Sequence, residues 1–102
     1  MTYGRQFDFR ADLQRFDKIK TDLEFHVMGY WKSHIVPFGR GQLFFVNYEA
    51  DEGVIIIDEN NPEFELNKYR INVSTSSEVL DNIMSKYIEL ILKNNNVEEI
   101  VK

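Results

Sequence analysis

The sequence predicts one α+β domain that spans residues 1–102. We expect an N-terminal helix, an antiparallel meander of three to four strands, and a C-terminal amphipathic helix packed on the sheet. Apolar residues recur at helical spacing near both ends, and the middle of the chain is rich in aromatic and β-branched residues. With 43% hydrophobic residues, a chain of 102 residues has material for one core but is short for two.

The N-terminal helix is expected to begin near Asp8, whose side chain is suited to cap a first turn. The apolar residues that follow are three or four positions apart, which places them on one helix face. They are Phe9, Leu13, Phe16, Ile19 and Leu23. The end of this helix has two alternatives: residues 23–27 alternate at period two, so residues 23–31 fit either a helix or the start of a strand.

A β-hairpin is the strongest local signal in the middle of the chain. Residues 43–48 and 54–57 are rich in aromatic and β-branched side chains, and residues 50–53 between them have turn chemistry. An earlier strand is expected at residues 35–36, before a turn, and a later strand within residues 64–73. Together these segments form the predicted meander.

The C-terminal helix is expected to start with a capping box formed by Thr75 and Glu78 and to end in a C-cap at residues 94–96. Six apolar side chains lie on one stripe, and burying them contributes on the order of 10–15 kcal/mol before entropy is subtracted. They are Leu80, Ile83, Met84, Tyr87, Ile88 and Ile91.

The composition excludes several classes of protein. The chain has no cysteine, which excludes disulfides, thiolate zinc sites and a cysteine nucleophile. No apolar run follows Arg5, unlike in a signal peptide. The apolar stretch at residues 54–57 is far shorter than the roughly 20 residues that cross a bilayer. We therefore expect a cytoplasmic protein with no membrane partner.

No motif for catalysis, a metal or a cofactor is complete. His26 and His34 are eight residues apart, a spacing that fits no common metal motif. The serines within residues 74–77 precede a helix, which explains them as caps, and no nucleophile-elbow sequence surrounds them. Residues 58–60 begin like a calcium loop, but Pro62 interrupts the ligand positions. We predict that the chain is not an enzyme and needs neither a cofactor nor a metal.

Negative charge is concentrated in one segment. The net charge of the chain is −5, and residues 41–67 contain seven acidic residues but no lysine or arginine. Such acids keep turns and strand ends solvated, or they form a surface that steers a basic protein toward the chain. In both cases the segment would repel nucleic acid, so no nucleic-acid partner is expected. The acids are Glu49, Asp51, Glu52, Asp58, Glu59, Glu63 and Glu65.

Aromatic and arginine residues near the acidic segment suit a protein interface, because Trp, Tyr and Arg are enriched at binding hot spots. Trp31 has the alternative role of completing the core. We predict that a basic protein or peptide binds through a set of eight residues. The set is Glu49, Asp51, Glu52, Asp58, Glu59, Tyr48, Trp31 and Arg40.

Residues 35–92 resemble the second half of SMI1/KNR4-type immunity proteins. The matching features are the Pro-Phe turn in Ile35–Gly39, the aromatic run Gly41–Val46, the hairpin strand Gly53–Asp58 and the helix Glu78–Leu92. Many members of that family neutralise bacterial toxins, so the resemblance implies a toxin antagonist. The chain lacks the longer helical N-terminal half of the family.

Two functions follow as expectations. The first is an inhibitor or immunity-type antagonist that uses the acidic hairpin against a basic protein. The alternative is a viral or phage accessory protein that binds a peptide along a strand edge or in a groove. A second copy of the chain, forming a homodimer, is a further candidate partner.

Overall fold

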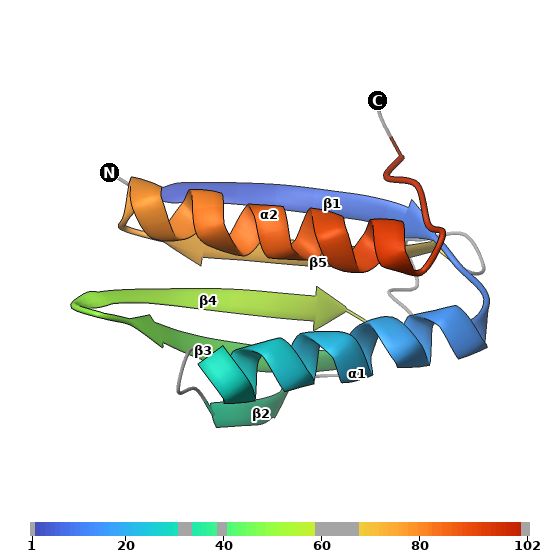
Figure 1. The fold of residues 1–102 in the computed structure, drawn as a ribbon, viewed down its shortest axis with the longest axis horizontal. Helices are drawn as coiled ribbons and strands as arrows, with labels where there is room; N and C mark the ends of the chain where they lie inside the picture. Colours follow the sequence, from blue (N-terminus) through green and yellow to red (C-terminus); the bar gives the residue numbers. More distant parts are fainter. Residues whose placement is uncertain (1, 31–33, 39–40, 59–67, 101–102) are drawn as a thin grey trace.

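The computed structural model describes residues 2–30, 34–38, 41–58 and 68–100 (Figure 1). Within these ranges five strands and two helices form an α+β fold. No helix in the same ranges is long and apolar enough to span a membrane. In chain order the elements are β1 (Tyr3–Arg10), α1 (Leu13–Tyr30), β2 (His34–Phe38), β3 (Gly41–Tyr48), β4 (Asp51–Asp58), β5 (Lys68–Thr75) and α2 (Glu78–Asn94).

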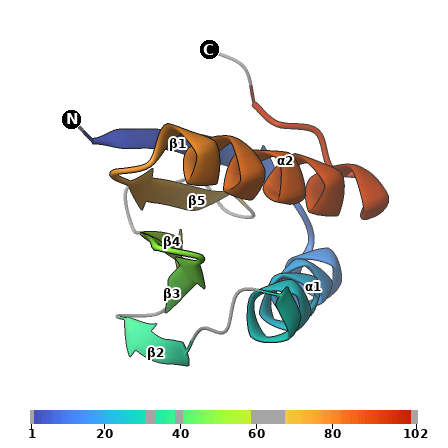
Figure 2. The same cartoon turned by 60° about the vertical axis from the view of Figure 1, so that its left-hand side comes forward.

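The strands form one antiparallel sheet in the order β1-β5-β4-β3-β2. Strands β2 to β5 follow one another as a meander, and β1 joins the sheet beside β5, so the first and last strands of the chain are neighbours. Both helices lie on the same side of the sheet (Figure 2). Helix α2 packs on β1, β4 and β5, while α1 contacts α2 and β2. We call the opposite side, which neither helix covers, the open face.

The prediction of a helix from Asp8 is wrong, because residues 3–10 form strand β1 and pair along their length with β5. Phe7 and Phe9 are both 0% exposed and point toward the helices, whereas Asp8 between them points to the open face. The predicted count of three to four strands is wrong for the same reason, since β1 adds a fifth strand to the sheet, beside β5.

Helix α1 begins only at Leu13, and its first turn is capped by Asp12, whose Oδ1 accepts the backbone N–H of Arg15 at 2.8 Å. Phe9 and Leu13 are four residues apart, as on one face of a helix, but Phe9 lies in β1 and Leu13 in α1. This spacing therefore gave a false helical signal. Leu13 itself is 58% exposed.

The helix-or-strand alternative over residues 23–31 resolves as helix as far as Tyr30. Leu23 and Val27 are buried and continue, at a four-residue step, the buried face that Phe16 and Ile19 begin. This segment is helical despite its period-two pattern, because a helix places its apolar face against the core.

The core lies between the two helices and the helix-facing side of the sheet. Phe16 of α1 stacks on Tyr69 of β5 with ring centroids 3.8 Å apart, and Phe9 of β1 contacts the same ring at 5.8 Å. Of the predicted stripe of α2, Ile83 and Tyr87 are only partly buried. Its fully buried members are Leu80, Met84, Ile88 and Ile91.

Local hydrogen bonds define both ends of α2. Ser77, rather than the predicted Thr75, is the N-cap, and its Oγ accepts the N–H of Leu80 at 3.2 Å. At the other end Asn96 has a φ of 56°, and the N–H of Val97 donates to the Leu92 carbonyl at 2.9 Å. These are the features of a Schellman motif, so the predicted C-cap within residues 94–96 is confirmed.

Candidate protein-binding surface

The β3–β4 hairpin gathers three of the predicted acids at its tip, Glu49, Asp51 and Glu52, which we call the acidic tip. Tyr48 pairs with Asp51, so the loop consists of residues 49–50 alone. The turn predicted at residues 50–53 is therefore displaced, because β4 already begins at Asp51. Glu49 and Glu52 are exposed and Asp51 is half-buried.

Glu49 occupies a backbone conformation that favours glycine, with a φ of 55°. Positive φ at the first residue of a two-residue hairpin loop is the pattern of a type II′ turn. A glutamate there stores backbone strain that a glycine would not. The strained residue is thus at the outermost point of the hairpin.

Glu49→Gly is expected to raise the free energy of unfolding by about 0.5–1 kcal/mol, because glycine adopts positive φ without the clash of a Cβ. Urea denaturation followed by circular dichroism measures the change. Ala50→Gly is the matched control: its φ is not positive, so glycine there should lower stability. A Glu49→Gly protein less stable than the parent would contradict the turn geometry.

Side-chain hydrogen bonds fix the acidic tip to the rest of the fold. Ser77 Oγ donates to Asp51 Oδ2 at 3.0 Å, and Thr75 Oγ1 donates to the backbone carbonyl of Glu52 at 2.7 Å. Thr75 ends β5 and Ser77 caps α2, so the residues from which the sequence predicted a capping box also position the hairpin. Asp51 is thereby a structural residue as well as an acidic one.

The first turn of α2 adds Glu78 and Asp81 near the acidic tip, since Ser77 at the start of this helix contacts Asp51. No lysine or arginine occurs in residues 41–58 or in residues 71–85. The β3–β4 hairpin and the segment that runs from β5 into the first two turns of α2 therefore bring negative charge, and no positive charge, to the region of the tip.

Of the other five predicted residues, the structure places Tyr48 beside the acidic tip and Asp58 away from it. Asp58 ends β4, seven residues from Asp51, which places it roughly 23 Å away along the strand. Tyr48 is only partly exposed and packs at the border of the core on the helix side. Glu59, Trp31 and Arg40 lie outside the residues that the structure describes. The predicted acidic hairpin is thus divided between opposite ends of β4.

The open face carries apolar side chains that the sequence-based set did not include. The register places Phe45 directly opposite Val54 and Leu43 directly opposite Ile56, and all four point away from the helices because their neighbours in the chain are buried on the other side. Phe45 is 39% exposed, as is Val36 on the neighbouring strand β2. An apolar strip therefore crosses the open face from β2 to β4.

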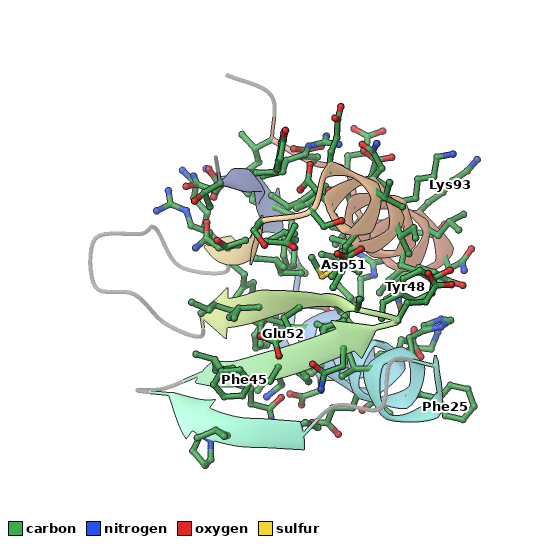
Figure 3. The ribbon with its side chains drawn as sticks, turned by 90° about the vertical axis from the view of Figure 1, so that its left-hand side faces the viewer. Phe25, Phe45, Tyr48, Asp51, Glu52 and Lys93 are labelled. Atoms are coloured by element: carbon green, nitrogen blue, oxygen red, sulfur yellow. The ribbon has the colours of Figure 1, made fainter. Side chains whose placement is uncertain are left out.

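A groove of about 500 Å³ joins this strip to the acidic tip. Phe45 lines it from β3 and Glu52 lines it from β4, and Figure 3 shows both residues along these two strands, with Tyr48 and Asp51 at the end of the hairpin. Ser74 of β5 pairs with Val54 and completes the row across the floor. The side chains of Asn47 and Ser76 also line the groove.

The surface offers contact chemistry: carboxylates at the acidic tip, hydroxyls and an amide on the rim of the groove, and an apolar floor. Within the described ranges, no three His, Asp or Glu side chains are grouped so that they could hold a metal ion. No protein-family model matches the chain, and no curated protein matches it. The resemblance to SMI1/KNR4-type immunity proteins stays a prediction.

Proposed function

We propose that the chain is a small acidic protein-binding domain, an inhibitor or immunity-type antagonist of a basic protein, and that the acidic tip contacts the partner. One observation carries this proposal: Glu49 and Glu52 are exposed at a hairpin end that Ser77 and Thr75 anchor to the fold. Exposed acids on an anchored tip attract a basic surface and lose little freedom on binding.

The alternative function, capture of a peptide, is better supported for the groove than for a strand edge. The end of edge strand β1 is already occupied, because the Ile100 N–H donates to the Asp8 carbonyl at 2.6 Å and Phe9 forms a bridge with Glu99. The other edge strand, β2, contains Pro37, which has no N–H to donate to an added strand. The groove on the open face has neither obstacle.

Glu49→Lys/Glu52→Lys is expected to weaken binding of a basic partner by about tenfold or more, because two attractive contacts become repulsive. The partner is the protein that the immobilised chain captures from its native source, and isothermal titration calorimetry measures its Kd. The parent should lose affinity as salt is raised, and the variant should respond less.

The matched control is Asp17→Lys/Glu98→Lys, which makes the same change in net charge at exposed positions away from the acidic tip. This variant should keep most of the affinity of the parent. If both double variants weaken binding equally, net charge rather than the acidic tip directs the interaction, and the proposal fails.

A further inference from the structure

We infer that the groove on the open face receives an apolar side chain from a partner segment that also carries lysine or arginine about two residues from that side chain. This inference rests on the proposed function and deepens it: the acidic tip attracts the partner, and the groove holds its apolar anchor. The binding surface then has two parts, one of charge and one of apolar contact.

The floor of the groove is suited to an apolar anchor. Phe45 is 39% exposed, while Phe44, the next residue of the same strand, is 0% exposed on the helix side. Phe45 lies directly opposite Val54, so the two form one continuous apolar surface at the bottom of the groove. A volume of about 500 Å³ lies within the range of ligand pockets and has room for at least one large side chain.

The rim of the groove specifies the charge of the occupant. Glu52 follows the same face of β4 as Val54, about 7 Å along the strand, and is the one acidic residue among the lining residues, which include no lysine or arginine. An apolar side chain over Val54 and a cation over Glu52 are therefore separated by about two residues of an extended segment. Asn47 and Ser74 add hydrogen-bonding groups beside the floor.

Charge also decides between a basic partner and a second copy of the chain. Each copy has a net charge of −5, and the acidic residues of the hairpin adjoin the groove in both copies. Packing two open faces together would bring two chains of like net charge into contact. A basic segment meets the same apolar floor without this repulsion.

The test uses the full chain and two synthetic peptides, Lys-Lys-Leu-Lys-Lys and Lys-Lys-Ser-Lys-Lys, which have equal charge. Titration followed by ¹⁵N–¹H NMR should show that the leucine peptide binds about tenfold more tightly. The largest chemical-shift changes should fall on Phe45, Glu52, Val54 and Ser74. Phe45→Ser should remove the preference for leucine.

Phe25→Ser is the matched control, because Phe25 is 71% exposed on α1 and far from the groove (Figure 3). This variant should bind both peptides as the parent does. Equal binding of the two peptides, binding of neither, or shifts confined to the helices would overturn the inference. So would analytical ultracentrifugation that shows a dimer dissociated by Phe45→Ser.

The failure of this inference is distinguishable from failure of the proposed function. If the two peptides bind equally and Glu49→Lys/Glu52→Lys weakens both, the acidic tip still recognises cations and the groove has no part in binding. If the native partner ignores that double variant, the proposed function fails whatever the peptides do.

Discussion

Gly53→Val is expected to lower the free energy of unfolding by about 3 kcal/mol. Gly53 is buried in β4 beneath α2, and a Cβ at this position would lie 2.7 Å from Met84 Cε and 3.2 Å from Leu80 Cδ2. The two methyl groups of valine cannot be accommodated unless α2 moves away from the sheet. Ser77, the N-cap of α2, donates to Asp51, so a shift of this helix should disturb the acidic tip as well.

Chemical denaturation of the variant measures this effect. Gly53→Ala is the graded control: its single methyl group meets the flexible end of Met84, so the loss should be near 1 kcal/mol. Ser74→Val, on the open face of the neighbouring strand, should change stability little. A Gly53→Val protein as stable as the parent would show that α2 does not pack closely on β4.

Arg70→Ala is expected to destabilise the fold by about 3 kcal/mol, because it removes a charged partner of a buried carboxylate. Arg70 Nε donates to Asp8 Oδ1 at 2.8 Å, and Gln6 Nε2 donates to Asp8 Oδ2 at 3.0 Å. The Asp8 side chain is only 6% exposed, and the pair lies directly across the β1–β5 register. The ion pair therefore ties the first strand to the last.

The double variant Asp8→Val/Arg70→Met separates the two contributions to this effect. The double variant removes the buried Asp8 carboxylate together with its Arg70 partner, so it should recover most of the stability lost in Arg70→Ala. Thermal unfolding by calorimetry measures all three proteins. A loss of less than about 0.5 kcal/mol in Arg70→Ala would place the pair among ordinary surface ion pairs.

Strand β1 could not be predicted because its pattern depends on distant partners. Arg5 stands on the same face as Phe7 and Phe9, where it breaks the apolar alternation expected of a strand. Its guanidinium lies 4.4 Å from the centre of the Phe7 ring and pairs with Glu89 and Glu99 near the other end of the chain. The residues next to Arg5 in the sequence do not predict these contacts, because the partners are more than 80 residues away.

Elements with local determinants were predicted more successfully. The hairpin of β3 and β4 follows from two β-rich runs joined by a short polar turn, and the exit of α2 follows from asparagines that adopt a Schellman motif. The N-cap of α2 was predicted two residues too early, because the hydroxyls of Thr75 and Ser77 are both suited to cap a helix. The fold distinguishes them, since the Thr75 hydroxyl donates instead to the Glu52 carbonyl.

The binding surface was predicted in part. The excess of acids is visible in the sequence, but the length of β4 separates Asp51 from Asp58, and this division depends on where the turn falls. The open face did leave a readable signal: residues 43–46 and 54–57 are apolar without alternation, which indicates a sheet with apolar side chains on both faces. The groove itself requires the register of three strands.

Photo-crosslinking at one position tests whether the partner binds on the open face beside the acidic tip. Asn47 is exposed on the open face, opposite Glu52 and between the acidic tip and the apolar floor. With benzoylphenylalanine in place of Asn47, the captured native partner should crosslink efficiently; with the same group in place of Leu90, which is 53% exposed on α2, it should not. Crosslinking at Leu90 and none at Asn47 would place the binding surface on the helices instead of on the open face.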